Sequence, residues 1–524
     1  MPTEHTTLAI LVGGQSSRLG TDKGLYRPLG DESLIRRTLR LWSSGSYIEE
    51  ILVVTKDAEQ AELYRSELRG LDVRVIADES PTSAAAWGIV SALSAAKSPS
   101  VMCAAVDQVA VRPRHFRALL AARSDAHARP VAFAEDADFE PLPSLWPKAI
   151  GERLAANCAA GMLSIRSLLR ECDAHEVRAP QYAKELRANC NTRAELDEYF
   201  GRALVDPFGR RLHYLRFSMT EACNLSCAYC LPEGFPEWYR HKAKLSGSDI
   251  DVLLRGFRQL GFRKVRFTGG EPTVHPDCMQ AVGTANELGY EKIALSTNGL
   301  LIRDLPKWRD AGLTAINVSL DSLNPDEFAV MAKSHDVERV LETIDAAIDA
   351  GIETKVNTVL MRSINGRAIE PLIEWALKLP ITLRFIELMP THLNRSFSST
   401  ERVSGTEIRE ILLAKGLSAE APGANAGPDL RGPAQVYTSP DHVGRIGLID
   451  PLSNNFCAAC NRLRVTARGK LKLCLFGDSD LPLDLTSPES VAAGVRAVIH
   501  TKPERHHLES GEVGNVSTFR TIGG

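Results

Sequence analysis

The sequence predicts an α/β protein in which two sets of alternating strands and helices follow one another. A chain of 524 residues is too long for one ordinary hydrophobic core, so two or three domains are expected. In both parts, short apolar runs typical of buried parallel strands alternate with amphipathic stretches. Gly, Pro and Arg interrupt both patterns at residues 200–211, which predicts the join between domains there.

The N-terminal domain is expected to span residues 1–200. Its buried strands are predicted at residues 8–12, 51–55, 73–77 and 101–106. Ser33 has the side chain of a good N-cap, so it is expected to begin a helix over Leu34–Trp42.

A second domain, residues 205–440, repeats the pattern with six strands, most of them separated by helical patterns. These strands are predicted at residues 215–219, 265–268, 293–297, 316–320, 355–360 and 383–387. Six successive βα units predict a partial (β/α)6 barrel with its chemistry at the C-terminal ends of the strands. Residues 421–433, rich in Gly, Pro and Ala, are expected to form a surface loop, and residues 441–524 a C-terminal extension.

Composition argues against several classes of partner. The net charge is only −3, the aromatic fraction is 6% and no basic tract stands out, so nucleic acid is not expected. The sequence contains no run of eighteen apolar residues, so no membrane span is predicted. The start also lacks a basic signal region. We therefore expect a cytoplasmic protein whose eleven cysteines serve metal ligation more than disulfides.

Cys223, Cys227 and Cys230, spaced CxxxCxxC, are the most informative residues of the chain. Three thiolates this close can hold three irons of a [4Fe–4S] cube, which leaves the fourth iron open to a small molecule. The alternative is a zinc site or a chance cluster, although no histidine lies near enough in sequence to complete a zinc tetrad.

A second triad, Cys457, Cys460 and Cys474, also lacks a fourth partner, and a degenerate zinc ribbon is its alternative interpretation. Two incomplete triads in one chain favour two cubes. Arg462 and Arg464 lie between the cysteines of this triad and would point to one side of an extended segment. There they could bind a triphosphate through charge-assisted hydrogen bonds, whereas the ordinary alternative is a solvated surface strand.

The first triad, with Tyr229 between its last two cysteines, resembles that of the radical S-adenosylmethionine (SAM) enzymes. From about residue 205 to the end, the chain resembles the GTP 3′,8-cyclase family of these enzymes, which opens molybdenum cofactor synthesis. Besides the second triad and its arginines, the resemblance rests on residues 206–210, 215–218, 268–272, 297–299, 317–321, 384–389 and 522–524.

This resemblance implies two [4Fe–4S] clusters, SAM and the substrate GTP. It implies SAM contacts at Tyr229, Gly270, Ser319 and Met389, and GTP contacts at Arg216, Arg266, Ser296, Lys355, Arg462 and Arg464. It also implies that the tail Gly523-Gly524 enters the barrel beside the substrate, although chain ends are usually frayed.

The implied reaction begins when the first cluster is reduced and SAM is cleaved to methionine and a 5′-deoxyadenosyl radical. The radical takes the hydrogen on C3′ of GTP, and the C3′ radical then attacks C8 of guanine. An electron-donor protein is an expected partner, and a homodimer is left open.

The N-terminal run from Leu11 to Lys23, GGxSxRxGxDK in its motif part, follows a predicted strand. Backbone amides of Gly13–Ser16, Gly14 among them, could cradle phosphates, with Arg18 and Lys23 as counter-charges. The run resembles the nucleotidyltransferases that include molybdenum cofactor guanylyltransferase, and residues 189–196 resemble that family's closing segment.

The resemblance implies a Rossmann-type fold and a pterin substrate, with Mg²⁺ at Asp107, a hard cation suited to carboxylate, and nucleotide contact at Asp78. The sequence departs from the family at residues 85–88 and after Asp107, so a structural remnant is the alternative, and GTP versus CTP stays open.

Two other functions remain in view for the whole chain. One is a peptide-modifying radical SAM enzyme of the SPASM type with an auxiliary cluster, although such enzymes normally carry more C-terminal cysteines. The other is a nucleotide-sensing scaffold without catalysis, which would bind nucleotide but hold no iron.

Overall fold

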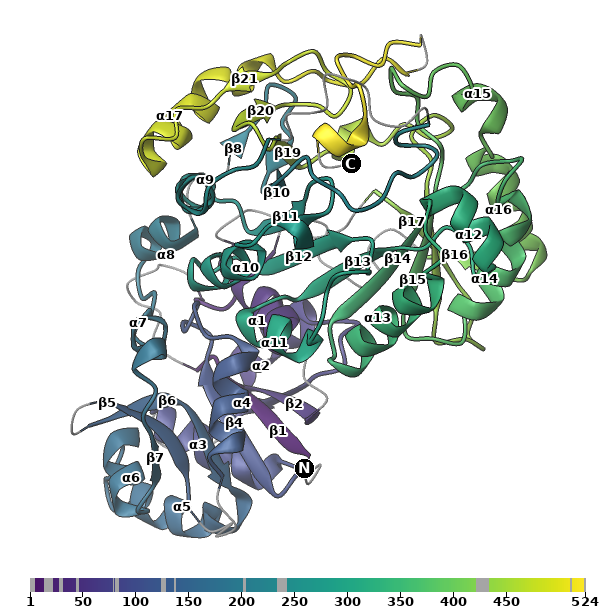
Figure 1. Ribbon diagram of the computed structural model, residues 1–524. Coiled ribbons are helices and arrows are strands. Elements are labelled where there is room, and N and C mark those ends of the chain that lie inside the picture. Colours follow the sequence, from purple (N-terminus) through teal and green to yellow (C-terminus); the bar gives the residue numbers. More distant parts are fainter. Residues whose placement is uncertain are drawn as a thin grey trace. The chain divides into compact units, whose positions relative to one another are not determined.

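The computed structural model describes residues 5–13, 22–27, 32–43, 47–78, 80, 84–123, 129–135, 138–200, 204–232, 243–420, 433–508 and 511–522. The chain forms two compact units, Met1–Phe200 and Gly201–Gly524, each with its own sheet and core (Figure 1).

The described residues of the first unit form a seven-stranded sheet in the order β3-β2-β1-β4-β6-β5-β7. β6 runs antiparallel to both of its neighbours, while the other pairs are parallel. The strands are β1 (Thr6–Leu11), β2 (Ile48–Thr55), β3 (Arg74–Ala77), β4 (Ser100–Ala105), β5 (Val131–Glu135), β6 (Asp138–Pro147) and β7 (His175–Val177).

Helices cover both faces of this sheet, because successive side chains of a buried parallel strand point to opposite faces. Leu8 and Ile10 of β1 belong to a core with α1, α2 and α4, whereas Ala9 and Leu11 belong to a core with α3, α5 and α6. The helices are α1 (Leu34–Trp42), α2 (Ala58–Glu67), α3 (Ala85–Ala95), α4 (Pro113–Ala121), α5 (Gly151–Ala159), α6 (Ile165–Glu171), α7 (Ala183–Leu186) and α8 (Arg193–Phe200).

The second unit has a twelve-stranded sheet among its described residues, in the order β16-β17-β18-β15-β14-β13-β12-β11-β10-β19-β20-β21. The strands from β18 to β19 in this order are parallel, and antiparallel strands extend the sheet at each edge. They are β10 (Tyr214–Ser218), β11 (Lys264–Thr268), β12 (Lys292–Thr297), β13 (Ala315–Ser319), β14 (Glu353–Val359), β15 (Thr382–Ile386), β16 (Ser418–Ala419), β17 (Gln435–Thr438), β18 (Arg445–Ile449), β19 (Arg462–Val465), β20 (Lys470–Lys472) and β21 (Leu481–Pro482). β8 (Leu204–Val205) and β9 (Arg211–Leu212) form a separate antiparallel pair.

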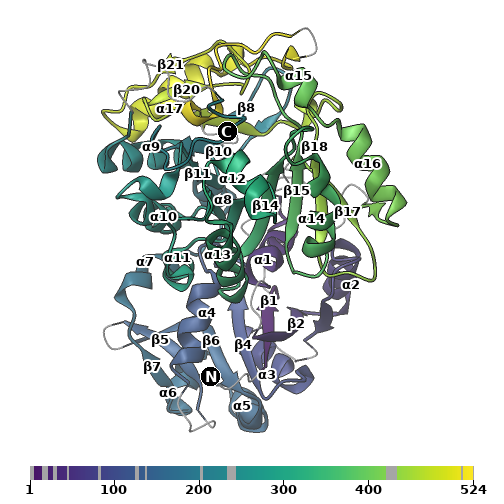
Figure 2. The same ribbon diagram turned by 45° about the vertical axis from the view of Figure 1, so that its right-hand side comes forward.

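Figures 1 and 2 show the helices of this unit outside the curved sheet, and the apolar faces of α9, α10, α11, α13 and α14 pack on it. The helices are α9 (Gly247–Gln259), α10 (Cys278–Glu287), α11 (Leu305–Ala311), α12 (Pro325–Ala332), α13 (Val337–Asp349), α14 (Ile369–Ala376), α15 (Ser398–Glu401), α16 (Gly405–Ala414) and α17 (Pro488–Val498). Short 3₁₀ turns used below are η7 (Cys457–Ala459) and η10 (Phe519–Thr521).

The predicted elements are confirmed with small shifts of their ends. The four N-terminal strands are β1 to β4, the six barrel strands are β10 to β15, and the Ser33 side chain accepts a hydrogen bond from the Arg36 amide at the start of α1. The structure adds two parallel strands, β18 and β19, to the predicted six, because segments of the C-terminal region pair with β15 and β10. Of the predicted loop at 421–433, residues 421–432 lie outside the described residues.

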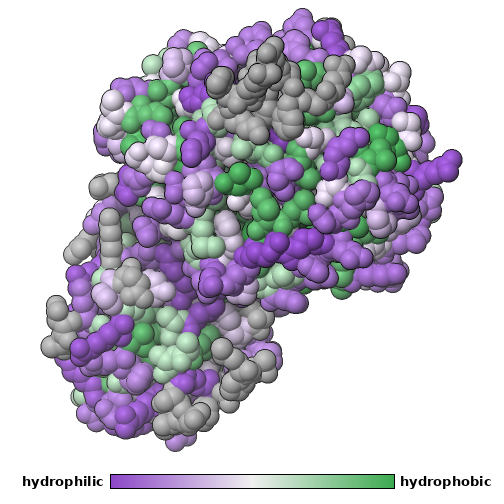
Figure 3. Space-filling view, in the orientation of Figure 1, coloured by the Kyte–Doolittle hydropathy of each residue, from purple (hydrophilic) through white to green (hydrophobic). Residues whose placement is uncertain are grey.

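Polar side chains cover most of the visible face of each unit (Figure 3). Among the described residues, no helix has the length and apolar character needed to cross a membrane.

Candidate functional site

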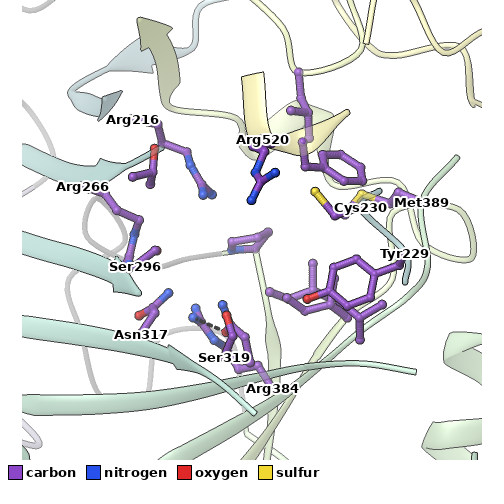
Figure 4. A pocket seen from close by; sticks show the side chains of 18 of the residues that line it. Arg216, Tyr229, Cys230, Arg266, Ser296, Asn317, Ser319, Arg384, Met389 and Arg520 are labelled. Atoms are coloured by element: carbon purple, nitrogen blue, oxygen red, sulfur yellow. Dashed lines mark hydrogen bonds between the residues drawn. The ribbon is translucent and has the colours of Figure 1, made fainter. Parts of the chain in front are cut away.

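A layer of arginines lines the interior of the barrel at one height. Arg216 of β10 lies directly in register with Arg266 of β11 on one side and with Arg464 of β19 on the other. Because alternate residues of a barrel strand point inward, three neighbouring strands present these guanidinium groups to one space. Figure 4 shows Arg216 and Arg266 pointing into it.

Further basic side chains surround this layer, namely Lys264, Lys355, Arg384, Arg462 and Arg520. Burial lowers the pKa of Arg216 to about 10 and that of Arg384 to about 9, and the positive charge of Arg266 nearby acts in the same direction in both cases. Burial and the charges of Arg216 and Arg462 also hold the pKa of Arg464 well below its usual range. The barrel interior therefore carries concentrated positive charge that a bound polyanion would stabilise.

Neutral polar side chains connect parts of this basic group. Arg266 Nε donates to the Tyr214 hydroxyl over 2.6 Å, and its Nη1 donates to Ser296 Oγ over 3.3 Å. Arg384 Nη2 donates to Asn357 Oδ1 over 2.6 Å, the contact drawn as a dashed line in Figure 4. Arg384 Nε and Asn317 Oδ1 are buried and have no hydrogen-bond partner among the described residues. A ligand with both donors and acceptors would satisfy these atoms.

These side chains line a cavity of about 380 Å³, a size typical of small-molecule sites. It brings together every residue of the second unit that the sequence singled out and the structure describes. They are the expected GTP contacts Arg216, Arg266, Ser296, Lys355, Arg462 and Arg464, the expected SAM contacts Tyr229, Gly270, Ser319 and Met389, and the expected iron ligands Cys223, Cys227, Cys230, Cys457, Cys460 and Cys474. In Figure 4, Tyr229, Cys230 and Met389 lie across the cavity from Arg216 and Arg266. Gly523 and Gly524 lie outside the described residues.

The first triad lies in the loop that follows β10, at the C-terminal end of the strand where barrel chemistry is expected. Buried Glu221 anchors this loop, since it accepts hydrogen bonds from Arg468 Nε at 2.8 Å and Nη2 at 3.0 Å. The Gly270 amide donates to the Thr220 carbonyl, and the Glu271 amide to the Ala222 carbonyl. The chain's own residues thus hold the loop from two directions.

Gly269 and Gly270 make this close packing sterically feasible. A Cβ atom at Gly270 would lie 2.2 Å from the Ala222 carbonyl oxygen, and one at Gly269 would lie 2.5 Å from that of Thr220. The sequence suggested that this pair lets backbone approach a charged ligand. The structure shows a second reason for glycine at these positions, which is close contact with the loop that carries the first triad.

Burial raises the pKa of the Cys227 and Cys230 thiols. Around Cys230, a hydrogen bond from Thr518 and the charge of Arg520 act in the opposite direction. A thiolate in so dry a place needs a cationic partner, and iron would supply one.

The second triad is more polar. Cys457 begins η7, Cys460 follows that turn and Cys474 follows β20. Burial alone would raise the pKa of Cys460, but the charges of Lys502 and Arg462 outweigh it and lower that pKa to about 7. This thiol therefore reaches its ligand form near neutral pH.

The three sulfur donors of each triad are of the kind that iron–sulfur clusters use. Among the described residues, no three Cys, His, Asp or Glu side chains lie close enough to hold one metal ion. A cube binds each thiolate through a different iron, so its ligands need not converge on one point. Soft sulfur donors and a cavity open to a further ligand match such a group.

Sequence reasoning missed several residues of the cavity. Lys264 precedes Arg266 by two positions on β11, so strand periodicity could have placed both on one face. Arg384 belongs to a segment that was predicted as a strand and noted for resemblance, but the residue itself was not singled out. Arg520 comes from the C-terminal segment, and no local pattern placed its side chain in the cavity.

In the first unit, the expected nucleotide residues follow the C-terminal ends of parallel strands, the usual ligand edge of such sheets. Leu11 ends β1, Gly13 follows it, Asp78 follows β3 and Asp107 follows β4. Asp78 is buried and accepts hydrogen bonds from the Ser80 amide and Ser91 Oγ, each at 3.1 Å. Gly14 and Arg18 lie outside the described residues.

Lys23 and Asp107 are brought together as an ion pair. Lys23 Nζ lies 2.8 Å from Asp107 Oδ2 and 3.0 Å from Asn191 Oδ1, so residues from three distant parts of the unit meet at one point. Asp22 beside Lys23 is held by the side chains of Gln60 and Tyr64 of α2. A metal ion bound at Asp107 would take the place of Lys23 as the partner of this carboxylate.

Comparison with known proteins assigns families to both units. Residues 217–376 match the Radical SAM superfamily, residues 381–508 match Molybdenum Cofactor Synthesis C, and residues 8–177 match the MobA-like NTP transferase domain. GTP 3′,8-cyclases from Cronobacter sakazakii, Yersinia pestis and Shewanella denitrificans are 43%, 42% and 39% identical to this chain. Each comparison covers 61% of this chain, and it covers 99%, 99% and 96% of the three relatives.

Among solved structures, molybdopterin-guanine dinucleotide biosynthesis protein A from Archaeoglobus fulgidus is 23% identical, with a TM-score of 0.32. The likeness covers 37% of this chain and 95% of that one. Streptococcus suis SuiB bound to S-adenosylmethionine is 14% identical over 63% of this chain and 73% of that one, with a TM-score of 0.37. We draw no conclusion from either likeness.

Proposed function

The chain belongs to the GTP 3′,8-cyclase family and joins to it a MobA-like NTP transferase domain, and from this we propose that its second unit converts GTP to (8S)-3′,8-cyclo-7,8-dihydroguanosine 5′-triphosphate in molybdenum cofactor synthesis. The observation that carries the proposal is the layer Arg464, Arg216 and Arg266 in one cavity with both cysteine triads. A triphosphate is the kind of anion that such a layer would bind, and the triads would hold the clusters next to it.

Membership of the radical SAM superfamily implies SAM and a [4Fe–4S] cluster. We assign that cluster to Cys223, Cys227 and Cys230, and a second one to Cys457, Cys460 and Cys474. When bound, SAM and the reduced cluster supply a radical that abstracts hydrogen from C3′ of GTP.

The chain's own residues orient GTP and exclude water. Arg216, Arg266 and Arg464 would hold the triphosphate by charge-assisted bonds, with Lys264, Lys355 and Arg384 as further counter-charges. Ser296 and Asn317, on neighbouring strands, would fix the polar edge of the nucleoside. Such positioning brings C3′ to the radical and C8 to C3′.

Two further assignments complete the proposal for the second unit. The second cluster would bind the guanine end of GTP, since its triad lines the same cavity as the arginine layer and Cys460 precedes Arg462 and Arg464 by two and four residues. An electron-donor protein would reduce the first cluster, and a cytoplasmic location would keep the ligand thiols reduced. A homodimer is compatible with both assignments.

A direct incubation tests the activity. Anaerobically reconstituted protein supplied with GTP, SAM and dithionite is expected to form the cyclic nucleotide, 5′-deoxyadenosine and methionine, which mass spectrometry detects. GTP deuterated at C3′ is expected to transfer its label to 5′-deoxyadenosine.

Uncoupled SAM cleavage without label transfer would contradict GTP as the substrate and favour the peptide-modifying alternative. Protein without iron that binds GTP and leaves it unchanged would favour the nucleotide-sensing scaffold.

For the first unit we propose Mg²⁺-dependent nucleotidyl transfer to a molybdenum-bearing pterin. Lys23, Asp78 and Asp107 gather at the ligand edge of the sheet, and Gly13 stands where the phosphate loop begins. In this proposal Lys23 leaves Asp107 to bind phosphate while Asp107 binds the metal.

The Lys23–Asp107 pair gives a sharp prediction for this unit. In full-length protein carrying Arg462→Ala and Arg464→Ala, which weaken the other GTP site, calorimetry is expected to detect GTP or CTP binding that needs Mg²⁺. Adding Lys23→Ala is expected to weaken this binding at least tenfold, since one charge-assisted bond contributes about 1.5–3 kcal/mol.

Asp107→Asn is expected to abolish the Mg²⁺-dependent binding, while Lys97→Ala, at an exposed lysine that precedes β4, serves as the matched control. Absence of nucleotide binding with or without Mg²⁺ would favour a structural remnant.

A further inference from the structure

The C-terminal segment 511–522 runs against the loop of the first triad. The His392 amide donates to the Val516 carbonyl over 3.0 Å, and the Leu393 amide to the Ser517 carbonyl over 3.3 Å. Thr518 follows directly, is fully buried, and places its Oγ1 3.1 Å from Cys230 Sγ and 2.9 Å from the Cys230 carbonyl oxygen. A residue near the end of the chain thus contacts a ligand position 288 residues earlier.

Which group donates the hydrogen in the contact between Thr518 and Cys230 depends on whether Cys230 is a thiol or a thiolate. As a thiol, Cys230 can donate its S–H to Thr518 Oγ1 while the hydroxyl donates to the carbonyl. As a thiolate bound to iron, the sulfur has no hydrogen and can only accept. The threonine hydroxyl, which also donates to the Cys230 carbonyl oxygen, is then the group that can donate across the 3.1 Å contact with sulfur.

We propose that Thr518 is a positioning residue of the first cluster, whose hydroxyl donates a hydrogen bond to the iron-bound sulfur of Cys230. This rests on the proposed function, because the first triad must hold the cluster. Hydrogen bonds to ligand sulfurs stabilise the added negative charge of a reduced cluster and raise its reduction potential.

Neighbouring contacts fix the position of the hydroxyl. Thr518 also caps η10, where Oγ1 accepts from the Arg520 amide, so its single hydrogen is directed at Cys230 and is shared between the carbonyl oxygen at 2.9 Å and Sγ at 3.1 Å. The Arg520 guanidinium, which is 4% exposed, donates to the Leu225 carbonyl in the same loop. The segment therefore contacts the cluster loop at two points, and at one of them Thr518 places a hydroxyl against a ligand sulfur.

Replacing Thr518 with valine removes the hydroxyl and keeps the side-chain shape. In reconstituted holoprotein titrated with dithionite, the cluster whose electron paramagnetic resonance signal changes on adding SAM is the first one. Its reduction equilibrium is expected to become about tenfold less favourable in Thr518→Val, which is about 59 mV for one electron. The potential of the second cluster is expected to stay unchanged.

Two variants separate the hydroxyl from the fold. Thr518→Ser keeps the hydroxyl and is expected to keep the wild-type potential. Thr521→Val removes a hydroxyl from the same turn that donates to the Thr518 carbonyl over 2.9 Å instead of to sulfur, and it is also expected to leave the potential unchanged.

The possible outcomes distinguish a hydrogen bond to the cluster sulfur from a purely structural role of Thr518. Loss of first-cluster iron in Thr518→Val that Thr518→Ser restores would also support the hydroxyl contact. A wild-type potential in Thr518→Val, or equal shifts or iron losses in the valine and serine variants, would overturn the proposal. Wild-type protein without any cluster that responds to SAM would instead contradict the assignment of the first triad.

Discussion

Cys227→Ala is expected to abolish SAM cleavage and to lower the iron content from about eight to about four per chain. Cys227 is the middle ligand of the first triad and packs against the core of the second unit. A cube held by two thiolates loses a covalent ligand that no neighbour can replace, because the nearest other cysteines along the chain belong to the same triad. The second triad lies on different elements, so its cluster is expected to remain.

The measurements are iron and sulfide analysis with methionine release under dithionite. Cys278→Ala is the matched control, since Cys278 is a buried cysteine of α10 in the same unit without motif spacing. It is expected to keep about eight irons and full SAM cleavage. SAM cleavage at the wild-type rate in Cys227→Ala would refute the assignment of the first triad, whatever its iron content.

Most of the fold follows from local pattern. In β1, Leu8 and Ile10 pack into one core while Ala9 and Leu11 pack into the other. This is why a continuous apolar run identifies a strand that is buried on both faces. The sequence could not predict that β18 and β19 extend the sheet, because their pairing with β15 and β10 joins segments far apart in the chain. The same holds for β6, whose antiparallel direction depends on its neighbours β4 and β5.

The residues of the candidate site likewise fall into those that local sequence predicts and those that only the tertiary structure brings into the cavity. The cysteine triads and Arg462-x-Arg464 could be read from spacing, since ligand chemistry depends on local order. Lys264 was within reach of strand periodicity. Arg384 and Arg520 acquire their place only through the closing of the barrel and the return of the chain end, so tertiary structure was needed to find them.

The double variant Arg462→Ala, Arg464→Ala is expected to weaken GTP binding by about two orders of magnitude or more while both clusters survive. Arg464 lies in register with Arg216 and 6% exposed inside the barrel, which excludes the solvated surface strand that the sequence left open for it. Each charge-assisted hydrogen bond to phosphate contributes about 1.5–3 kcal/mol, and about 1.4 kcal/mol corresponds to tenfold in affinity.

Removing the buried charge of Arg464 and the partly buried charge of Arg462 from a group of like charges is expected to have the opposite effect on the stability of the free protein. Burial and like charges lower the pKa of Arg464 and Arg216, so the variant is expected to unfold at the same or a higher temperature than wild type without GTP. A site whose arginines served the fold alone would instead lose stability when they are removed.

Calorimetry with GTP, thermal melts without it, and iron analysis together test this prediction. Arg255→Ala is the matched control, because Arg255 on α9 is about half exposed, pairs with Asp251 and lies away from the cavity-lining residues. Unchanged GTP affinity in the double variant would show that the arginine layer is not the phosphate site. A lower melting temperature with unchanged GTP affinity would show that these arginines stabilise the fold. If the layer is an anion site, the double variant is instead expected to lose GTP affinity without losing stability.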